Sequence, residues 1–535
     1  MAQHIVVTGG GSLLGRALVA SQGTAGSVRR ASEGDLRDEA FARQLVEDAE
    51  VLIHLAPLYP DVATGASPRD RLDLATRGTY VLLNAAVAAG VKRVVLGSCL
   101  DLLERYPRTW AVSEAWQPRP DVTNVSQLAV YLTEETAKQV ARTEPLSIIC
   151  LRFGTIVDDD VVAGKRYDPR WLHVDDAVEA CHQAVQMSLA SRGPGMTGSP
   201  HHGWSVYHIP GGGADTRIPL AGARGDEGLS YEPRHAFETS PRSDDATHEA
   251  STADASGDLA VLGPRVHIPS RPIRNVVIFG AGGPLAAATA RVLASSYRLR
   301  LTDLRAIAEI EAENKPQSEG APLPHVLGEP HETMQVDVTD LAQVMRACEG
   351  MDAIINCTVL RPHPVHAFLV NFLGAYNVML AATTHAIRRV VHTGPQLVTM
   401  DRPAGYWWDF AVPDDAPPRA GTWLYGITKY LGQETVRLFA EEYDLEVPVL
   451  LYSSFVDPAT AAPQAGGVFP MSVSWDDAGH AMRRALESPT LPSPFEIFHV
   501  LADLPMGKYS NAKAKRLLGW QPRDNLAHLW ATRPA

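Results

Sequence analysis

The chain has 535 residues, of which 45% are hydrophobic and 20% charged, a composition typical of folded proteins with more than one core. Its 48 Lys and Arg against 61 Asp and Glu give a formal net charge of −13, which argues against a general binder of nucleic acid or anionic membranes. No apolar run approaches the roughly 18 residues of a membrane span. The five cysteines are scattered without metal-ligand or disulfide spacing. We expect a cytoplasmic protein without a signal peptide.

The first predicted elements are an apolar strand at residues 5–7, a glycine-rich turn and a helix. The turn supplies Gly9 and Gly15, with Ser12 at the middle position. Glycines at such a turn let the backbone approach a pyrophosphate, and the helix that follows aims its N–H groups at the phosphates. We therefore assign Gly9 and Gly15 to a dinucleotide site.

The second predicted strand, at residues 27–30, ends in Arg29 and Arg30 and carries no acid. One of these arginines could meet the 2′-phosphate of NADP, or both could belong to a solvated basic turn. Asp35 comes straight after a further predicted strand and is assigned to cofactor binding. Short apolar strands then alternate with amphipathic helices, which predicts an α/β domain with a doubly wound parallel sheet.

Composition changes between residues 239 and 272. From 239 to 260 there is no aromatic residue, and Ser, Thr, Ala and acidic residues dominate. Such a stretch buries too little apolar surface to offset the entropy lost on ordering. We therefore predict a first domain at 1–238, a flexible acidic linker at 239–272 and a second domain at 273–535.

The second domain opens with another strand and glycine-rich turn, in which Gly280, Gly283 and Ala286 are spaced GxxGxxA. Its second predicted strand ends in Asp303, whose carboxylate suits the ribose hydroxyls of NAD and repels a 2′-phosphate. Asp337 follows a later strand and matches Asp35. These residues favour NAD as the cofactor of the second domain, while NADP stays possible in the first.

The strongest catalytic pattern is Tyr425-Gly-Ile-Thr-Lys429 at the start of a predicted helix. The spacing i, i+4 places both side chains on one helix face. A nearby ammonium lowers the pKa of a phenol, so that the tyrosine can act as general acid or base toward an alcohol or carbonyl. Tyr425 and Lys429 are therefore the predicted catalytic pair.

The two domains repeat each other in sequence. The matching pairs of segments, in chain order, are 5–15 with 276–286, 51–57 with 353–358, 77–86 with 373–382, 92–97 with 388–393, 174–177 with 475–478 and 229–234 with 518–523. Repeats of this length are domains, so the sequence predicts two tandem Rossmann-type domains.

Both repeats resemble the short-chain dehydrogenase/reductase superfamily in its extended, NAD-dependent epimerase/dehydratase branch. The segment 406–458 of the second repeat is most similar to uronate-dehydrogenase-type members, through a Pro-rich loop followed by Tyr425–Lys429. The resemblance implies that Lys429 also binds the cofactor ribose. It further implies a catalytic Ser or Thr at the place of Pro395, for which Thr393 is the nearest substitute.

The first repeat departs further from this pattern. Cys99 stands where Pro395 stands in the second repeat, and Tyr131 aligns with Tyr425. Glu135 then takes the place of the lysine, and a carboxylate would raise the pKa of the phenol. We expect the first domain to be catalytically degenerate.

Other clusters are assigned structural roles, and no metal site is expected. His201-His202 and the His363/His366 pair are interpreted as loop histidines because no further ligands accompany them. Asp175-Asp176 and Asp476-Asp477 are predicted to cap helices. Trp407-Trp408 could line a sugar site or belong to the core.

These patterns predict an NAD(P)-dependent oxidoreductase or epimerase acting on a sugar-like alcohol or carbonyl, possibly a uronic acid or nucleotide sugar. The alternative is a dinucleotide-binding regulatory or scaffold protein without turnover, which Ser12, Glu135 and Pro395 favour. Domains of this branch commonly pair through two helices each. The corresponding segments here are 73–89, 130–142, 370–385 and 425–442, so we expect the repeats to form an intramolecular pseudo-dimer.

Overall fold

The structure, a computed structural model, divides the chain into two compact units, residues 1–263 and 264–535. It describes residues 4–21, 27–30, 34–56, 66–187, 203–212, 217–225, 228–237, 263–399, 411–461, 468–505 and 507–529. Most of the predicted linker lies outside these ranges. Its last part packs on the second unit, because Arg265 N donates to Glu442 O and Ile268 is 4% exposed. The second unit therefore begins before residue 273.

The first unit is built on a six-stranded parallel sheet in the order β2-β1-β3-β4-β5-β8. The strands of this sheet are β1 (His4–Thr8), β2 (Ser27–Arg30), β3 (Val51–His54), β4 (Arg93–Cys99), β5 (Ser147–Phe153) and β8 (Trp204–Ile209), and β6 (Thr155–Val157) and β7 (Trp171–His173) form a separate two-stranded sheet. Its helices are α1 (Leu13–Ser21), α2 (Glu39–Val46), α3 (Pro68–Asp73), α4 (Thr79–Ala88), α5 (Val125–Thr143), α6 (Asp159–Val162), α7 (Val174–Gln186) and α8 (Ala221–Arg224).

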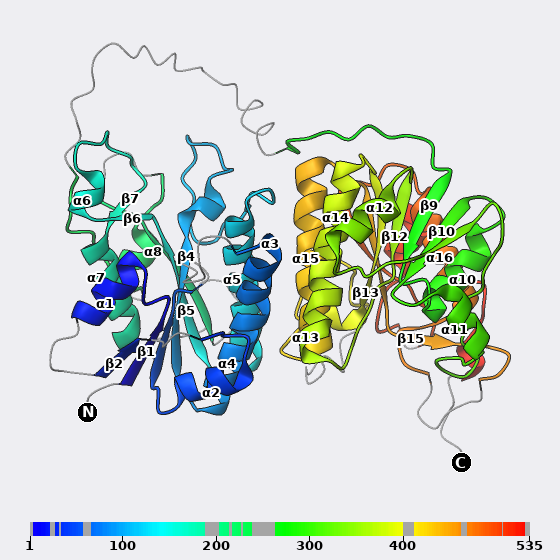
Figure 1. Cartoon of the computed structure of the whole chain (residues 1–535), viewed down its shortest axis with the longest axis horizontal. Helices are drawn as coiled ribbons and strands as arrows, with labels where there is room; N and C mark the ends of the chain where they lie inside the picture. Colours follow the sequence, from blue (N-terminus) through cyan, green and yellow to red (C-terminus); the bar gives the residue numbers. More distant parts are fainter. Residues whose placement is uncertain are drawn as a thin grey trace, which may run out of the picture. The chain divides into compact units, whose positions relative to one another are not determined.

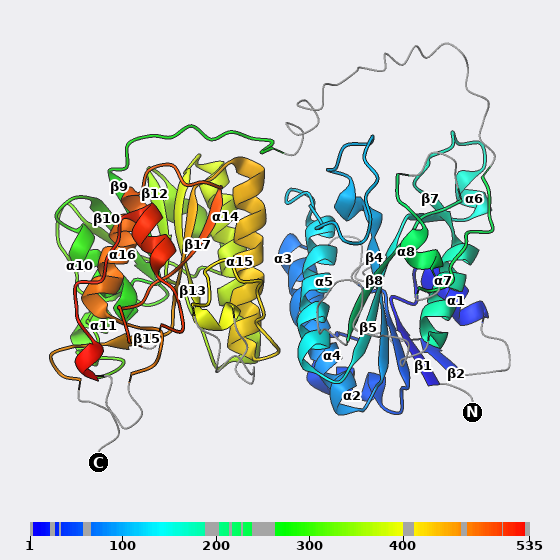
Figure 2. The same cartoon turned by 180° about the vertical axis from the view of Figure 1, so that it is seen from behind.

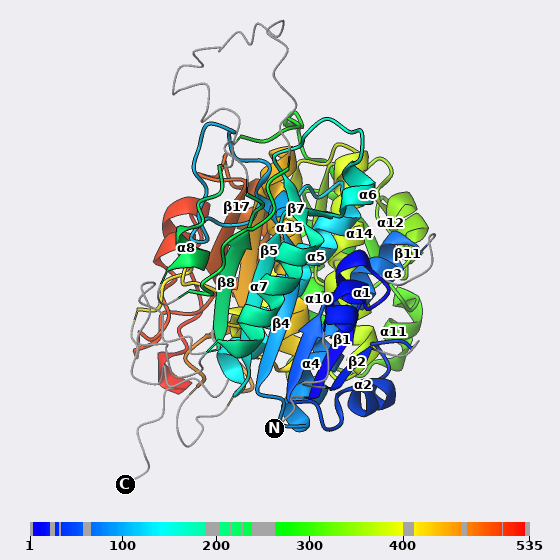
Figure 3. The same cartoon turned by 90° about the vertical axis from the view of Figure 1, so that its left-hand side faces the viewer.

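Helices cover both faces of this sheet. Figure 3 shows α1 and α7 lying across one face, where Leu14 and Leu18 pack with Ile53 and Leu151. On the other face, α2, α4 and α5 form a second core (Figure 1). The strands are mostly apolar because both faces of the sheet are covered, with buried polar exceptions such as His54, Ser98 and Arg152.

The second unit has a seven-stranded parallel sheet in the order β11-β10-β9-β12-β13-β14-β17. The strands of this sheet are β9 (Asn275–Phe279), β10 (Arg298–Asp303), β11 (Glu332–Gln335), β12 (Ala353–Asn356), β13 (Arg389–Pro395), β14 (Val447–Tyr452) and β17 (Phe495–His499), and β15 (Ser454–Val456) and β16 (Ser472–Ser474) form a separate two-stranded sheet. Its helices are α10 (Pro284–Leu293), α11 (Ile307–Glu313), α12 (Leu341–Cys348), α13 (Pro364–Ala367), α14 (Gly374–Thr384), α15 (Leu424–Tyr443) and α16 (Trp475–Glu487).

In this unit α10 and α16 cover one face of the sheet, and α14 and α15 cover the other (Figure 2), with α12 in contact with α14. The strand order reverses between β9 and β12, which is the switch point where doubly wound sheets bind dinucleotides beyond the carboxyl ends of their strands. The predicted fold class, two tandem doubly wound α/β domains, is confirmed. Their packing against each other as a pseudo-dimer stays a prediction.

One helical run, Pro364–Thr384, is long and apolar enough to cross a membrane, which corrects the expectation that no such run exists. In the structure 78% of its apolar window is buried. The run contains α13, a π-helical segment (Phe368–Leu373) and α14. Burial of this kind is what a core helix of a folded domain shows.

A buried histidine, His54, lies at the end of β3 in the first unit, where the second unit has an asparagine. His54 Nδ1 lies 2.7 Å from Thr8 Oγ1, and its Nε2 lies 3.2 Å from Thr79 Oγ1. His54 ends β3 as Asn356 ends β12 in the second unit. Complete burial lowers the pKa of His54 to about 3.

We therefore expect His54→Asn to reduce the sensitivity of the first unit to acid. The folded state holds His54 neutral, whereas the unfolded chain takes up the proton below about pH 6.5. The stability that neutral His54 contributes is thus complete above that pH and is lost as the pH falls toward the folded pKa, at about 1.4 kcal/mol per pH unit. Urea unfolding of both proteins at pH 7 and pH 5 measures this. An unchanged pH dependence in the variant would contradict the assignment.

Candidate functional site

The glycine-rich turn of the second unit lies at the switch point of its sheet. Gly280 has φ of +77°, and a Cβ there would stand 3.0 Å from the backbone of Cys357 and Thr358. Gly283 is the N-cap of α10, and Ala286 is buried in its first turns. Only a residue without a side chain fits at Gly280, so the turn brings bare backbone to the place where a pyrophosphate would bind.

Asp303 closes this turn from the next strand. Its Oδ2 accepts a hydrogen bond of 2.9 Å from Gly282 N, and its Oδ1 accepts one of 3.3 Å from Arg305 N. A Cβ on Gly282 would lie 2.9 Å from the same carboxylate oxygen. The half-buried carboxylate is therefore held against the glycine turn, as the ribose of a dinucleotide requires.

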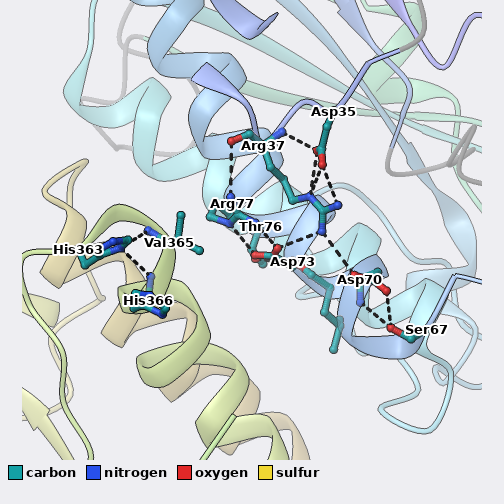
Figure 4. Close-up of polar contacts among 11 residues, drawn as sticks. Asp35, Arg37, Ser67, Asp70, Asp73, Thr76, Arg77, His363, Val365 and His366 are labelled. Carbon is teal, nitrogen blue, oxygen red and sulfur yellow. Dashed lines mark hydrogen bonds and ion pairs between the residues drawn. The ribbon is translucent and has the colours of Figure 1, made fainter. Parts of the chain in front are cut away.

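The two other predicted acids differ in what they already bind. Asp337 Oδ1 accepts a hydrogen bond of 2.9 Å from Thr339 N. Asp35 is held by Arg37, whose Nε lies 2.9 and 3.0 Å from its two carboxylate oxygens (Figure 4). Burial acts to raise the pKa of Asp35, but the hydrogen bonds and charge of Arg37 lower it overall. Asp35 is thus committed to an ion pair.

Arg37 is the centre of a larger network in the first unit. It also lies 3.1 Å from Asp73 and 3.6 Å from Asp70, and Arg77 pairs with Asp73 (Figure 4). The network fixes the segment after β2 to α3 and to the π-helical segment Leu74–Gly78. The side chains of Arg29 and Arg30, the candidates for a 2′-phosphate contact, lie outside the described residues.

The glycine turn of the first unit is complete. Gly9 has φ of +69°, and a Cβ on Gly15 would stand 2.4 Å from Gly9 O. Ser12 substitutes for the middle glycine by donating from its hydroxyl to Gly9 O and accepting from Gly15 N. Both predicted glycines are therefore required by the turn itself.

Tyr425 and Lys429 lie in the first two turns of α15. Lys429 is 3% exposed, and its Nζ donates to Thr358 O at 3.3 Å, beyond the end of β12. Burial lowers the pKa of Lys429 to about 8. Burial raises the pKa of Tyr425, and Arg361, whose guanidinium carbon lies 5.1 Å from the ring centre, opposes that rise. The ammonium thus lies near the carboxyl end of the sheet, on the side of the glycine turn.

Thr393, predicted as the nearest substitute for a catalytic Ser or Thr, already uses its hydroxyl in a hydrogen bond. Its hydroxyl donates to Asn356 O at 2.8 Å, between two strands of the sheet. Pro395 ends β13, and Gln396 follows it. The Thr393 hydroxyl is therefore bonded within the sheet, and the end of the strand presents a proline without a hydrogen-bonding group.

Two polar pairs that the sequence analysis missed lie at the ends of β13 and β17. Gln396 Nε2 donates to the hydroxyl of Tyr509 at 2.9 Å, and His499 N donates to Asp414. Burial raises the pKa of Asp414 to about 6 and lowers that of His499 to about 4. A pattern search misses them because these partners are far apart in the chain.

The predicted equivalence of Tyr131 and Tyr425 is wrong. Asn124 is the N-cap of α5 and Trp423 that of α15, so the two helices start at matching positions. In the first unit Thr133 of α5 donates from its Oγ1 to Ala75 O in the π-helical segment Leu74–Gly78. In the second unit the residue of α15 that packs on the matching π-helical segment is Gly432, on which a Cβ would lie 2.3 Å from Asn371 O. Thr133 therefore corresponds to Gly432, and Ala75 to Asn371.

These contacts match Tyr131 with Tyr430. The places of Tyr425 and Lys429 are held in the first unit by Ser126, which is exposed, and Val130. The sequence pattern paired Tyr131 with Tyr425, which lies in the first turn of α15, because α15 carries a second tyrosine, Tyr430, one turn later. The first unit therefore lacks both members of the pair, which strengthens the prediction that it is degenerate.

A buried ion pair fills the adjacent interior of the first unit. Arg152 Nη2 lies 2.6 Å from Glu134 Oε2, both side chains are at most 5% exposed, and Ser98 donates to the same carboxylate. The second unit has no such pair at this place. Gln433 stands where Glu134 is, next to Gly394. Leu451 stands where Arg152 is, because it is the strand partner of Gly394 as Arg152 is of Ser98.

The remaining predicted clusters are structural where they are described. His363 Nδ1 accepts from the N–H groups of Val365 and His366 and so caps α13 (Figure 4). The caps of α7 and α16 are His173 and Ser474, and the predicted acids lie in the first turn. All five cysteines are free. His201-His202 and Trp407-Trp408 lie outside the described residues.

Comparisons with known proteins match both units separately. Residues 276–474 match the NAD dependent epimerase/dehydratase family, and residues 20–107 match the 3-beta hydroxysteroid dehydrogenase/isomerase family. These matches support the predicted extended short-chain dehydrogenase/reductase domain. The first family is NAD-dependent, in agreement with the predicted cofactor and enzyme class.

Curated relatives and solved structures align with about half of the chain. The uronate dehydrogenase of Pseudomonas syringae pv. tomato is 26% identical over 229 residues, 42% of this chain and 73% of that protein. The NAD-dependent glucose-6-phosphate dehydrogenase of Haloferax volcanii is 25% identical over 267 residues, 47% of this chain and 94% of that protein. The uronate dehydrogenase structure from Agrobacterium tumefaciens has a TM-score of 0.36 and 22% identity, covering 47% of this chain and 85% of that one.

Proposed function

We propose that the second unit is an NAD-dependent oxidoreductase or epimerase that acts on a sugar-like alcohol or carbonyl. The observation that carries the proposal is the position of buried Lys429, one helical turn after Tyr425, with its Nζ on Thr358 O beside the Gly280 turn. A catalytic ammonium at the carboxyl end of the sheet can reach both a bound ribose and a tyrosine on its own helix face.

The residues present fit a dinucleotide. Gly280 offers bare backbone at the switch point, Asp303 stands at the turn for the ribose hydroxyls, and Asp337 lies at the next strand end for the adenine side. When bound, NAD supplies a hydride acceptor. Tyr425 removes the proton of the substrate hydroxyl, and Lys429 holds the ribose and stabilises the phenolate.

The substrate class is supported by the relatives, which include uronate dehydrogenases and a sugar-phosphate dehydrogenase. We propose a uronic acid or a nucleotide sugar. Incubation of the full chain with NAD⁺ and members of each class separates the two reactions. Net NADH formation indicates a dehydrogenase, whereas inversion of a substrate carbon without NADH indicates an epimerase.

A second candidate is a dinucleotide-binding scaffold without turnover. Pro395 at the end of β13 favours it, as does the hydroxyl of Thr393, which is bonded to Asn356 O. Such a protein binds NAD and leaves every sugar unchanged. The incubation with NAD⁺ and sugars therefore distinguishes the two candidates.

Cofactor choice is expected to depend on Asp303. Asp303→Ser removes the negative charge that opposes a 2′-phosphate and also the acceptor for the ribose hydroxyls. NAD affinity should fall by about tenfold, equivalent to roughly 1.4 kcal/mol, while NADP affinity rises. Calorimetric titration of both cofactors into the full chain measures the ratio of NAD affinity to NADP affinity. Asp337→Ser is the matched control: because Asp337 is assigned to the adenine side, which both cofactors share, its loss should leave this ratio unchanged. A ratio unchanged by Asp303→Ser would contradict the assignment.

We also propose that the two units pair within one chain. The two helices through which each unit is expected to pair lie on one face of its own sheet. They are α4 and α5 in the first unit and α14 and α15 in the second. Small-angle scattering of the full chain should give a radius of gyration near that of one compact body, about 24 Å for this length. A pair-distance distribution with two separate maxima would show two independent domains instead.

A further inference from the structure

A cluster of two histidines and an aspartate lies in the first unit, outside the site described above. His173 is the last residue of β7, Asp175 lies in the first turn of α7, and His235 comes from a segment far along the chain (β7, α6 and α7 are labelled in Figure 3). One ligand atom from each lies within 4.8 Å of the other two. The two imidazole rings are stacked with centres 3.8 Å apart.

We propose that His173, Asp175 and His235 form a binding site for a divalent transition-metal ion, with Zn²⁺ as the representative ion. Asp175 Oδ2 is the common point of the cluster, 3.6 Å from His173 Nδ1 and 3.7 Å from His235 Nε2. Ligands of one zinc ion, each about 2.0–2.2 Å from the metal, stand roughly 3 to 4 Å apart. Small side-chain rotations therefore close the set around one ion.

The outer nitrogens of both histidines face carboxylates. His235 Nδ1 lies 3.3 Å from Asp176 Oδ1, and His173 Nε2 lies 3.7 Å from Asp159 Oδ1. A carboxylate at one ring nitrogen attracts the proton to that side and leaves the lone pair of the other nitrogen for a metal. The lone pairs of His235 Nε2 and of His173 Nδ1, which accepts a hydrogen bond from Asp175 N, are then the ones nearest the Asp175 carboxylate.

The second unit shows what the same backbone looks like without the cluster. Asp176 accepts from the N–H groups of Arg234 and His235, as Asp477 accepts from those of Arg523 and Asp524. His173 takes the capping place of Ser474, and His235 the place of Asp524. The histidines are therefore not needed for the turn itself.

The donor set decides the kind of ion, and the exposure of the ligands decides whether the ion can enter. Imidazole with carboxylate is a donor set that Zn²⁺, Co²⁺ and Ni²⁺ accept, whereas Ca²⁺ and Mg²⁺ prefer oxygen alone. Side chains of Asp175 and His235 are 67% and 41% exposed, so an ion can enter from solvent. Three protein ligands leave a fourth position for water. Binding costs the hydrogen bond of 3.2 Å from Asp175 N to His173 Nδ1.

The test is a titration of the chelator-treated full chain with Zn²⁺, and with Co²⁺ read by its visible absorption. We expect one ion per chain and a rise in the unfolding temperature of the first unit. His235→Asp and His173→Ser, which install the second unit's residues, should each weaken binding by at least about 10- to 100-fold. Co²⁺ should then lose its visible bands.

The His363→Ala/His366→Ala double variant is the matched control because it removes the other close histidine pair and should leave the titration unchanged. If His235→Asp misfolds, His235→Ala is used in its place, because it keeps the backbone N–H that donates to Asp176. No zinc equivalent in the natural chain, binding unchanged in both cluster variants, or loss of binding in the control would each overturn the site.

Discussion

Replacing Tyr425 by Phe is expected to lower turnover by about 10²- to 10⁴-fold, the range in which a positioned acid or base contributes. The variant keeps the ring, its cation–π contact with Arg361 and the packing against Trp423, and loses the hydroxyl together with the hydrogen bond that Arg361 makes to it. NAD affinity should therefore stay unchanged while the rate constant falls. Steady-state rates and cofactor titration on the same preparation separate the two effects.

Tyr131→Phe is the matched control in the first unit. Because Tyr131 corresponds in place to Tyr430, and Ser126 and Val130 hold the places of the catalytic pair, its removal should leave turnover unchanged. Equal losses from both variants would show that the first unit also takes part in catalysis.

Arg152→Leu is expected to destabilise the first unit by about 3–5 kcal/mol, because it strands the buried carboxylate of Glu134 without its partner. The pair is bound by two hydrogen bonds, of 2.9 and 2.6 Å, from Arg152 to Glu134. Burial disfavours the charge on Arg152, and the carboxylate outweighs it and raises the pKa of the guanidinium. Urea unfolding, followed by a probe confined to the first unit, measures the loss.

The double variant Glu134→Gln/Arg152→Leu installs the residues that the second unit carries at this place, Gln433 and Leu451. Replacing a buried ion pair by groups of similar volume is often close to neutral, so most of the loss should be recovered. A double variant as unstable as Arg152→Leu alone would show that the damage comes from packing and not from the stranded charge.

The sequence predicted the fold because its signals are local. Gly280 and Asp303 sit at fixed distances from apolar strands, and each of these patterns has a mechanical reason that does not depend on distant residues. The end of a strand followed by a glycine turn therefore predicted the place of the turn in both units, and it is at this turn of the second unit that we propose a cofactor site.

The fine register of α5 could not be obtained in this way. Tyr131 stands near the place where a pattern search expects the catalytic tyrosine, and only the contact from Thr133 to Ala75 reveals the slip. Asn124, a capping residue at the start of the helix, was a local signal that could have set the frame. Partners far apart in the chain, such as Gln396 with Tyr509, give no such signal.

In the proposed reaction, hydride passes from a carbon of the sugar-like substrate to NAD⁺ in the second unit, while Tyr425 takes the proton of the substrate hydroxyl. The most direct measurement follows absorbance at 340 nm for the full chain with NAD⁺ and uronic acids, aldoses or nucleotide sugars, beside the Tyr425→Phe variant. We expect the natural protein to form NADH or an epimer of the sugar with at least one class, and the Tyr425→Phe variant to lose that conversion. Stoichiometric NAD binding with no conversion of any of these sugars, to NADH or to an epimer, would contradict the proposed reaction.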